Sequence, residues 1–267
     1  MAYYQCGSCG FVYSGTFLSP EASIRFYDAK HQYLNYASYV KPSVALGKSL
    51  NFRDSVALLR ASFPGAGRRA LDIGCGSGQS LEVLQGCGYE PTGLEISRYA
   101  AGMARERGVG EVHCADARQL ATLGLPRFDA IFMFDVLDHV NQPGEVMQTV
   151  FDQLQPGGGV ILEVVNIASP LAYLMGSRYM HIIPYEHLSY FSPQTLRHFL
   201  ARCGFAEIVV KPAYRFVTFD FIVTTLLEFN PMLGRMLQVV GKGVGRTLRE
   251  KPFPIPCGAL CGIAGKA

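Results

Sequence analysis

The feature that most constrains the fold is a glycine-rich segment at residues 71–78, which reads LDIGCGSG. A short apolar run at residues 70–73 enters the glycines, and we expect a helix at residues 79–85 after them. Glycines accept positive φ and let the backbone come close to a ligand. The first turn of the following helix leaves backbone N–H groups for an anionic group. The pattern therefore predicts a strand, a ligand-binding loop and a helix, in that order.

Apolar runs and helical patterns alternate on both sides of this loop. We expect strands at residues 70–73, 91–96, 111–115, 128–134, 160–165, 207–211 and 260–264, and helices at residues 46–60, 79–85, 98–107, 143–154 and 193–202. This order predicts an α/β fold with a doubly wound, mostly parallel, seven-stranded Rossmann-like sheet and helices on both faces. We divide the chain into a tyrosine-rich cap (1–45), a core (46–216) and an apolar helical segment with the final strand (217–267).

The composition narrows the choice of partners. Charged residues make up only 17% of the 267 residues, which predicts extra buried surface, and the net charge of +3 is too balanced for a nucleic-acid-binding protein. The longest apolar stretch, residues 217–240, is interrupted by polar residues and does not predict a membrane span. Eight scattered cysteines and the lack of a secretion signal predict a cytoplasmic protein with reduced thiols.

The apolar segment at residues 217–250 ends in several basic residues. We expect it to cover the sheet or the cleft, or to contact another subunit. A peripheral contact with a membrane surface is the alternative. The sequence leaves open whether the protein is a monomer or a homodimer.

Two kinds of nucleotide ligand suit the glycine loop. Dinucleotide-binding loops read G-x-G-x-x-G, and Gln79 stands where the third glycine would be. The spacing G-x-G-x-G fits a loop for S-adenosylmethionine (SAM) better. Glu95, 21 residues after Gly74, can accept hydrogen bonds from the ribose hydroxyls of either ligand. A nicotinamide-dependent oxidoreductase is therefore an alternative, and a SAM-binding module without activity is another.

These features resemble the class I SAM-dependent methyltransferases over residues 50–211. The resemblance implies that Asp72 orders the loop and the methionine end of SAM. It further implies cofactor contacts by the loop, by the acid of the second strand and by residues after the third and fourth strands: Gly74, Cys75, Gly76, Gly78, Glu95, Ile96, Asp116, Ala117, Phe134 and Asp135. Many family members have Glu where Asp135 and Asp138 stand here.

The segment EHLSYFSP at residues 186–193 resembles the branch that includes ubiquinone-biosynthesis-like and sugar methyltransferases. That resemblance places Glu186 and His187 over the substrate cleft. A neutral histidine accepts a proton well near pH 7, so His187 is the predicted base and Glu186 its orienting partner. The alternative is that His187 only holds the loop. His139, after the fourth strand, is expected to pack or to position the acceptor.

Tyr27, Tyr33, Tyr36 and Tyr39 either form a lid over an aromatic acceptor or pack the N-terminal helix.

The predicted reaction is methyl transfer from SAM to a hydroxyl of a small molecule that is aromatic or sugar-like. C-methylation of a sugar or quinone-type ring is the alternative. Residues 134–137 read FDVL instead of the Asn/Asp-Pro-Pro-aromatic sequence that accompanies methylation of amino groups in adenine or glutamine.

A cysteine pair near the start, Cys6 and Cys9, has the form of half a zinc knuckle. Structural zinc needs four ligands, and Cys257 and Cys261 stand at the far end of the chain. We therefore expect no bound metal, although the pair leaves zinc binding open.

Overall fold

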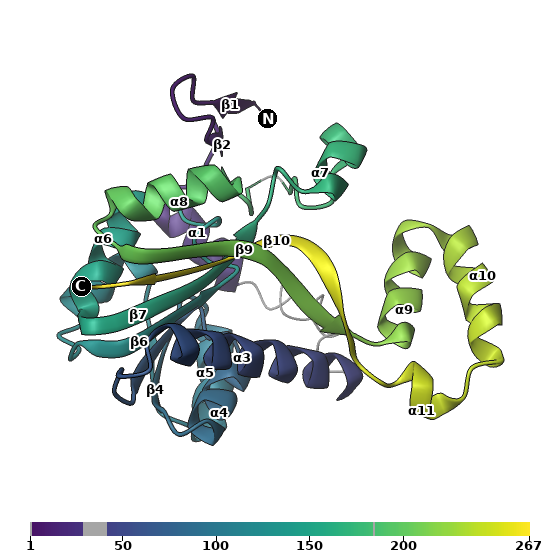
Figure 1. The fold of residues 1–267 in the computed structure, drawn as a ribbon, viewed down its shortest axis with the longest axis horizontal. Coiled ribbons are helices and arrows are strands. Elements are labelled where there is room, and N and C mark those ends of the chain that lie inside the picture. Colours follow the sequence, from purple (N-terminus) through teal and green to yellow (C-terminus); the bar gives the residue numbers. More distant parts are fainter. Residues whose placement is uncertain (1, 29–41, 184) are drawn as a thin grey trace.

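The computed structural model describes residues 2–28, 42–183 and 185–267. Its centre is a seven-stranded sheet with the order β5-β4-β3-β6-β7-β10-β9 (Figure 1). These strands are β3 (Arg69–Ile73), β4 (Glu90–Glu95), β5 (Glu111–Cys114), β6 (Phe128–Phe134), β7 (Leu154–Val165), β9 (Ala206–Val217) and β10 (Phe253–Gly265). The strands β5, β4, β3, β6 and β7 are parallel, and β10 is antiparallel to both of its neighbours. The predicted fold class is confirmed.

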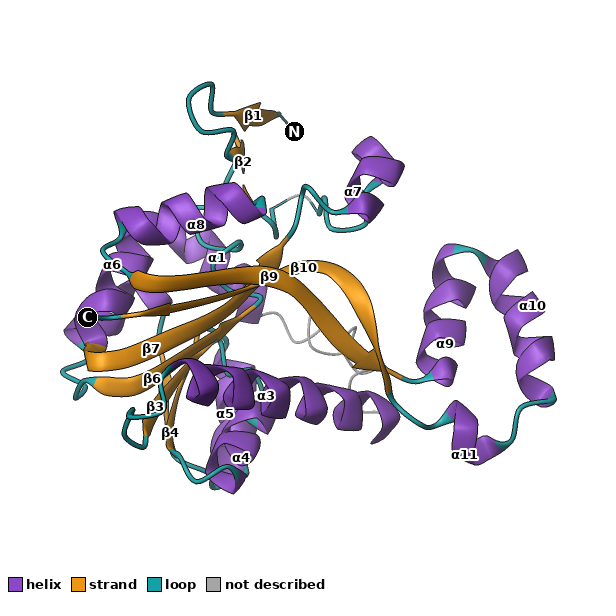
Figure 2. Ribbon diagram, in the orientation of Figure 1, coloured by secondary structure: helices purple, strands orange, loops and turns teal. Residues whose placement is uncertain are grey.

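Helices cover both faces of the sheet. They are α3 (Pro42–Ser62), α4 (Gln79–Gly86) and α5 (Arg98–Glu106) on one face, and α6 (Pro143–Gln153) and α8 (Pro193–Arg202) on the other (Figure 2). A hydrophobic core lies on each face of the sheet, between the strands and the helices. Alternate residues of β6 belong to the two cores, because successive side chains of a strand point to opposite faces. Ile131 and Met133 pack with α6 and α8, whereas Ala130 and Phe132 pack with α3, α4 and α5.

The last two strands are longer than the sequence predicted. Residues 252–256, which read PFPIP, looked like a connector, yet Phe253 pairs with Val217 at the far end of a ribbon formed by β9 and β10. Pro254 and Pro256 cannot donate backbone hydrogen bonds. They are tolerated because β10 pairs with β7 only from Ala259 onward, so among the described strands only β9 pairs with the proline-containing part.

A second, small sheet of three strands lies at the top of the view in Figure 1, and the sequence did not predict it. The hairpin of β1 (Tyr3–Gln5) and β2 (Val12–Ser14) pairs with β8 (Ser189–Tyr190). This pairing ties the N-terminal cap to the chain segment just before α8. The helix α1 (Pro20–Asp28) follows and carries Tyr27, while Tyr33, Tyr36 and Tyr39 lie outside the described residues.

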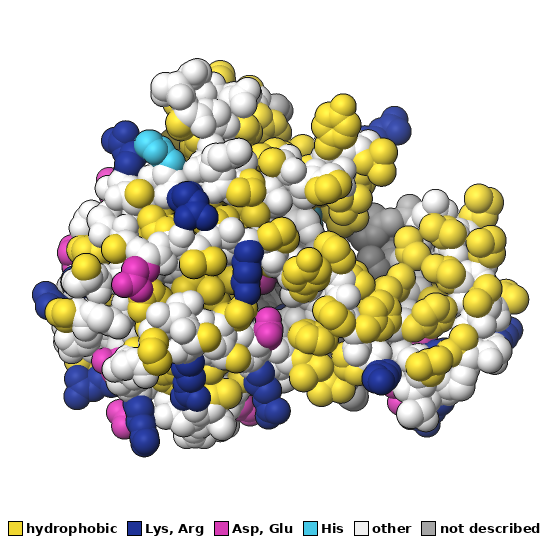
Figure 3. Space-filling view, in the orientation of Figure 1, with side chains coloured by type: hydrophobic (Ala, Val, Ile, Leu, Met, Phe, Trp, Pro, Cys, Tyr) yellow, Lys and Arg dark blue, Asp and Glu magenta, His cyan; other side chains and the backbone are white. Residues whose placement is uncertain are grey.

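The C-terminal helices α9 (Phe219–Phe229), α10 (Pro231–Lys242) and α11 (Arg246–Arg249) extend from the end of the β9–β10 ribbon (Figure 1). Hydrophobic side chains gather on their surface (Figure 3), and Met232 and Met236 of α10 are 80% and 61% exposed. Among the described helices none combines the length and the apolar character needed to cross a bilayer. The peripheral membrane or subunit contact of this segment stays a prediction, as does the division of the chain into three parts.

Candidate functional site

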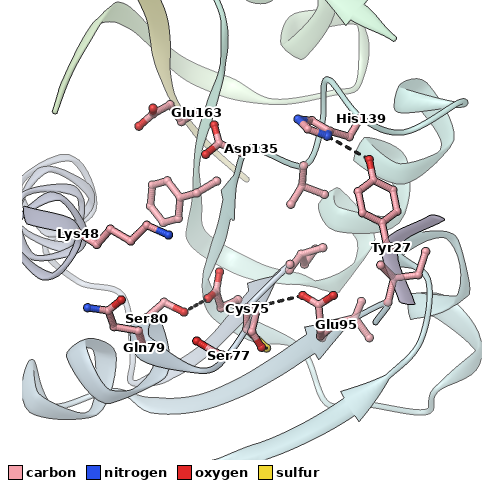
Figure 4. Close-up of a pocket in the computed structure, with 18 of the residues that line it drawn as sticks. Tyr27, Lys48, Cys75, Ser77, Gln79, Ser80, Glu95, Asp135, His139 and Glu163 are labelled. Atoms are coloured by element: carbon pink, nitrogen blue, oxygen red, sulfur yellow. Dashed lines mark hydrogen bonds between the residues drawn. The ribbon is translucent and has the colours of Figure 1, made fainter. Parts of the chain in front are cut away.

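A cavity of about 660 Å³ opens at the carboxyl ends of β3, β4 and β6. Its volume lies in the range of about 300–1,000 Å³ that is usual for small-molecule sites. Ten of the eleven residues for which the resemblance implied cofactor contacts line it: Asp72, Gly74, Cys75, Gly76, Glu95, Ile96, Asp116, Ala117, Phe134 and Asp135. Gly78 is the exception. Figure 4 shows Cys75 and Ser77 of the glycine loop on one side of this space, with Lys48 of α3 and Asp135, which follows β6, on another.

The glycine loop needs its glycines for two different reasons. Gly74 has φ +78°, and a Cβ there would lie 2.4 Å from Cγ2 of Val136. A side chain at this position would therefore be both strained and blocked. Gly78 has φ +83° and begins α4 without a side-chain cap. The first N–H groups of α4 are thus left without a capping side chain beside the loop.

Glu95 connects the end of β4 to the loop. Its Oε2 accepts a hydrogen bond from the backbone N–H of Gly76 at 2.8 Å, and its Oε1 accepts one from the N–H of Ser97 at 2.9 Å. The side chain is buried, and burial raises its pKa. Each carboxylate oxygen has a second lone pair. Glu95 can therefore accept further hydrogen bonds from a ligand in the cavity.

Asp72 sits beneath the loop at the end of β3. It is 2% exposed, and its Oδ2 accepts a hydrogen bond from the Ser80 hydroxyl in the first turn of α4. Burial, together with the charge of nearby Glu95, raises the pKa of Asp72 to about 7, against the opposing effect of the Ser80 hydrogen bond. The carboxyl group therefore links β3 to α4, and a cationic ligand beside it would lower its pKa.

Asp116 follows β5 and begins the short 3-10 helix η2 (Ala117–Thr122). Its carboxylate accepts three hydrogen bonds from Arg118, one from the backbone N–H and two from the guanidinium, at 2.6–2.9 Å. Hydrogen bonding by Arg118 overcomes the effect of burial and lowers the pKa of Asp116. If the adenine amino group of SAM donates a hydrogen bond to Asp116, it must share the carboxylate with Arg118.

Comparison with known proteins agrees with this geometry. The family profile described as "Methyltransferase domain" matches residues 50–210, which is more than half of the chain. The chain belongs to this methyltransferase family. It is a SAM-dependent methyltransferase, and SAM is the methyl donor of the family.

Curated relatives are similar at moderate identity. A ubiquinone biosynthesis O-methyltransferase of Aromatoleum aromaticum is 29% identical over 52% of this chain and 64% of its own length. A protein of the same name from Paraburkholderia phymatum is 28% identical over 80% of this chain and 95% of its own length. The first alignment covers a little less than two thirds of the relative.

Among solved structures, magnesium protoporphyrin IX methyltransferase from Synechocystis PCC 6803 has a TM-score of 0.61 at 15% identity and covers 93% of this chain and 100% of its own. At 15% identity this similarity shows that the two proteins share a fold.

The cofactor half of the cavity has the donors and acceptors that SAM requires. The carboxylate of SAM suits the start of α4, which no side chain caps. The ribose hydroxyls suit the acceptor oxygens of Glu95, and the cationic end suits Asp72. The absence of a side chain at Gly74 leaves room for close approach. The residues present therefore fit SAM, and SAM supplies a methyl group already activated on sulfur.

The other half of the cavity is bounded by His139, Glu186 and Tyr27. Nδ1 of His139 lies 3.1 Å from the Tyr27 hydroxyl, which joins α1 to the turn after β6 (Figure 4). His187, the predicted base, is not among the residues that line the cavity. It is 7% exposed, its ring packs edge-on against His139 with 4.5 Å between centroids, and its Nε2 lies 3.9 Å from Oδ2 of Asp138.

Sequence reasoning missed an ionic cluster on a further wall of the cavity. Arg215 of β9 donates two hydrogen bonds to the carboxylate of Asp135, at 3.0 and 3.1 Å, and two to Oε1 of Glu163, at 2.8 and 3.1 Å. Asp135 has φ +54°, which is unusual for a residue with a side chain. Desolvation opposes ionisation of Asp135, but the Arg215 guanidinium still lowers the pKa of its carboxyl group.

Lys48 of α3 also reaches this wall (Figure 4). Burial lowers its pKa to about 8, against the opposing charge of Asp135. One signal for the cluster was present in the sequence, because Glu163 interrupts an apolar run that was predicted to be a buried strand.

Cys6 and Cys9 lie in the turn between β1 and β2. Sγ of Cys6 is 3.1 Å from the Ser8 hydroxyl, and hydrogen bonding to Ser8 and Cys9 lowers the pKa of Cys6 to about 6. Among the described residues, no third Cys, His, Asp or Glu joins the pair in a metal-binding group. Zinc binding by this pair stays an open prediction.

Proposed function

We propose that this enzyme transfers the methyl group of SAM to a hydroxyl oxygen of a small molecule. The observation that carries the proposal is that His139 lines the half of the cavity not assigned to SAM, with Asp138 and His187 next to it behind the wall. The O-methyltransferase names of the curated relatives support the same reaction. The acceptor occupies the space beside Tyr27, His139 and Glu186, in reach of the methyl donor.

Methyl transfer to a hydroxyl requires that the oxygen lose its proton. SAM leaves as a neutral thioether, so the enzyme must hold the acceptor oxygen in line and promote this proton loss. Burial lowers the pKa of His139, so its imidazole is neutral near pH 7. His139 meets the acceptor because it lines the cavity, and Asp138 and His187 act from behind it. In this proposal His187 supports His139 and is not the group in contact with the acceptor.

The acceptor is a small hydroxylated molecule, aromatic or sugar-like. Apolar and aromatic side chains supply part of the wall, among them Phe52, Phe134 and Phe221, and Phe52 packs edge-on against Phe134 with 5.1 Å between ring centroids. Together with the polar side chains of Tyr27, His139 and Glu186, these apolar groups suit a substrate with an apolar body and one oriented hydroxyl.

The test is a methyl-transfer assay with labelled SAM and a panel of hydroxylated aromatic and sugar acceptors. For an accepted compound, His139→Gln should lower kcat by about 100-fold or more, the effect typical of removing a group that moves a proton. His198→Gln, a change of an exposed histidine on α8, is the matched control. Affinity for S-adenosylhomocysteine should be equal in all three proteins.

An unchanged rate in His139→Gln would contradict the role assigned to His139. NMR of the product distinguishes a methyl ether from a C-methyl group, and a C-methyl product would replace the O-methylation proposal with its alternative.

A further inference from the structure

Three residues from two distant parts of the chain meet in one buried cluster, here called the histidine–aspartate cluster. Asp138 and His139 lie in the turn after β6, and His187 lies two residues before β8. The backbone N–H groups of Leu188 and Ser189 both donate to the carbonyl oxygen of Asp138, at 2.7 and 3.1 Å. These two hydrogen bonds fix the segment that carries His187 against the turn that carries the other two residues.

The cluster leaves buried polar atoms without hydrogen bonds. Asp138 is fully buried; its Oδ2 accepts a hydrogen bond from the N–H of Val165 at 3.0 Å, but its Oδ1 has no hydrogen-bond partner among the described residues. The same holds for Nε2 of His139 and Nδ1 of His187. An unsatisfied buried polar atom costs about 1–3 kcal/mol, so native proteins rarely keep several of them together without a water or an ion.

The spacing of the cluster is too wide for hydrogen bonds and suits a shared ion. Nε2 of His139 is 3.8 Å from Oδ1 of Asp138, and Nε2 of His187 is 3.9 Å from Oδ2. One ligand atom from each of the three residues lies within 4.8 Å of the others. Nitrogen and oxygen ligands stand about 2.0–2.2 Å from a zinc ion, so two of them are separated by about 3–4 Å.

A hydrogen bond from outside the cluster fixes the orientation of His139. The Tyr27 hydroxyl lies 3.1 Å from Nδ1 of His139. When Nδ1–H donates to this hydroxyl, the lone pair of Nε2 points to the cluster, which is the arrangement that orients most metal-bound histidines.

We propose that Asp138, His139 and His187 bind one divalent transition-metal ion, of which Zn²⁺ is the probe, and that this ion binds the hydroxyl of the methyl acceptor. Two histidines and one carboxylate are the ligands of known metal sites that keep a position open for a water or a substrate. His139 lines the cavity, whereas Asp138 and His187 lie behind it, so the open position faces the cavity.

The inference rests on the proposed O-methylation and refines the role of His139 in it: Nε2 of His139 binds the ion, and the ion promotes the proton loss that the reaction requires. His139→Gln removes this ligand, so the expected fall in kcat is the same. The metal-bound hydroxyl has a lowered pKa and releases its proton to water. A lone pair of the resulting oxyanion then forms the O–CH₃ bond while the S–CH₃ bond of SAM breaks, and S-adenosylhomocysteine leaves as a neutral thioether. Acceptors with a second oxygen beside the hydroxyl would hold the ion with two ligands and be preferred.

The test is metal binding to the full-length protein after removal of metal by a chelator. Because Cys6 and Cys9 can also bind zinc, the background is the Cys6→Ser/Cys9→Ser protein, whose changes lie in the β1–β2 turn outside the cavity. Calorimetry with Zn²⁺ should show one equivalent bound, and Co²⁺ should give a visible spectrum without a thiolate band. His187→Ala and Asp138→Asn should each weaken binding by about 100-fold or more, while His198→Gln should not.

Circular dichroism and the binding of S-adenosylhomocysteine are measured on the same variants. If His187→Ala does not fold, Asp138→Asn, which keeps the side-chain shape, decides the matter. Zn²⁺ affinity that is absent in the background protein, or unchanged in Asp138→Asn, would overturn the metal site. If the metal site is overturned in this way, the proposed function is judged by the background protein alone. Binding of S-adenosylhomocysteine and formation of a methyl ether by that protein would support O-methylation without a metal, and the loss of both would refute the proposed function.

Discussion

Glu95 at the end of β4 accepts a hydrogen bond from the backbone N–H of Gly76 in the loop after β3, with 2.8 Å between Oε2 and N. The acid that should bind the ribose of SAM thus also holds the loop that should bind the rest of the cofactor. The two parts of the cofactor site are therefore coupled, and a change at Glu95 should affect both.

We expect Glu95→Gln to weaken the binding of S-adenosylhomocysteine by roughly 10- to 100-fold, because hydrogen bonds to a charged group contribute about 1.5–3 kcal/mol. Titration calorimetry measures the effect. Glu90→Gln is the matched control, since Glu90 is exposed at the opposite end of the same strand. Equal affinity in both variants would show that Glu95 does not contact the cofactor.

Gly74→Ala should abolish cofactor binding and destabilise the protein. The added Cβ would meet Val136 at 2.4 Å in a residue with φ +78°. Gly108→Ala has the same kind of backbone strain at φ +67° but nothing within 4 Å of its Cβ. We expect the control to lose about 1–2 kcal/mol of unfolding free energy and to keep its cofactor affinity. Urea denaturation measures the unfolding free energy of the two variants, and calorimetry measures their affinity for S-adenosylhomocysteine. Equal values of both quantities in Gly74→Ala and Gly108→Ala would contradict the prediction.

The raised pKa of Asp72 predicts a pH dependence of stability. Its ordinary value is 3.8 and its value in the folded protein is about 7, so the folded state binds more protons between these limits. The free energy of unfolding should therefore fall as the pH rises through this window, by roughly 2–4 kcal/mol. In Asp72→Asn this contribution should vanish, so the stability of the unmodified protein should rise relative to that of the variant as the pH falls. Equal slopes from urea denaturation between pH 4.5 and 7.5 would contradict the prediction.

Arg215 should be needed for stability because Glu163 is largely buried beside it. Its guanidinium nitrogen and Oε1 of Glu163 are 2.8 Å apart. Arg215→Met leaves that carboxylate without its cation, and we expect a loss of about 3 kcal/mol. Adding Glu163→Gln should restore part of the loss, whereas Arg202→Met on the exposed end of α8 should have little effect. A double variant no more stable than Arg215→Met would contradict this explanation.

The sequence predicted the fold well where local pattern decides it. The run at residues 128–134 became the central strand β6, and the glycines at residues 74–78 became the predicted turn between β3 and α4. In both places the apolar pattern and the turn residues indicate the same structure. The ribbon formed by β9 and β10 was underestimated, because prolines in a strand depend on which neighbours the strand has.

Local pattern did not predict which side chains meet in the acceptor half. The placement of His187 beside Asp138 depends on hydrogen bonds from Leu188 and Ser189 to the Asp138 carbonyl, which join distant parts of the chain. The β1–β2 hairpin was missed for the same reason, because its partner β8 is only two residues long. Contacts of this kind follow from the tertiary structure and not from periodicity.

The most direct test of the account is a crystal structure of the protein with S-adenosylhomocysteine. We predict the ligand in the cavity lined by Asp72 and Glu95, with a ribose hydroxyl within hydrogen-bond distance of Glu95 and its sulfur directed to His139. A ligand bound elsewhere, or a ribose that does not contact Glu95, would contradict the assignment of the cofactor site.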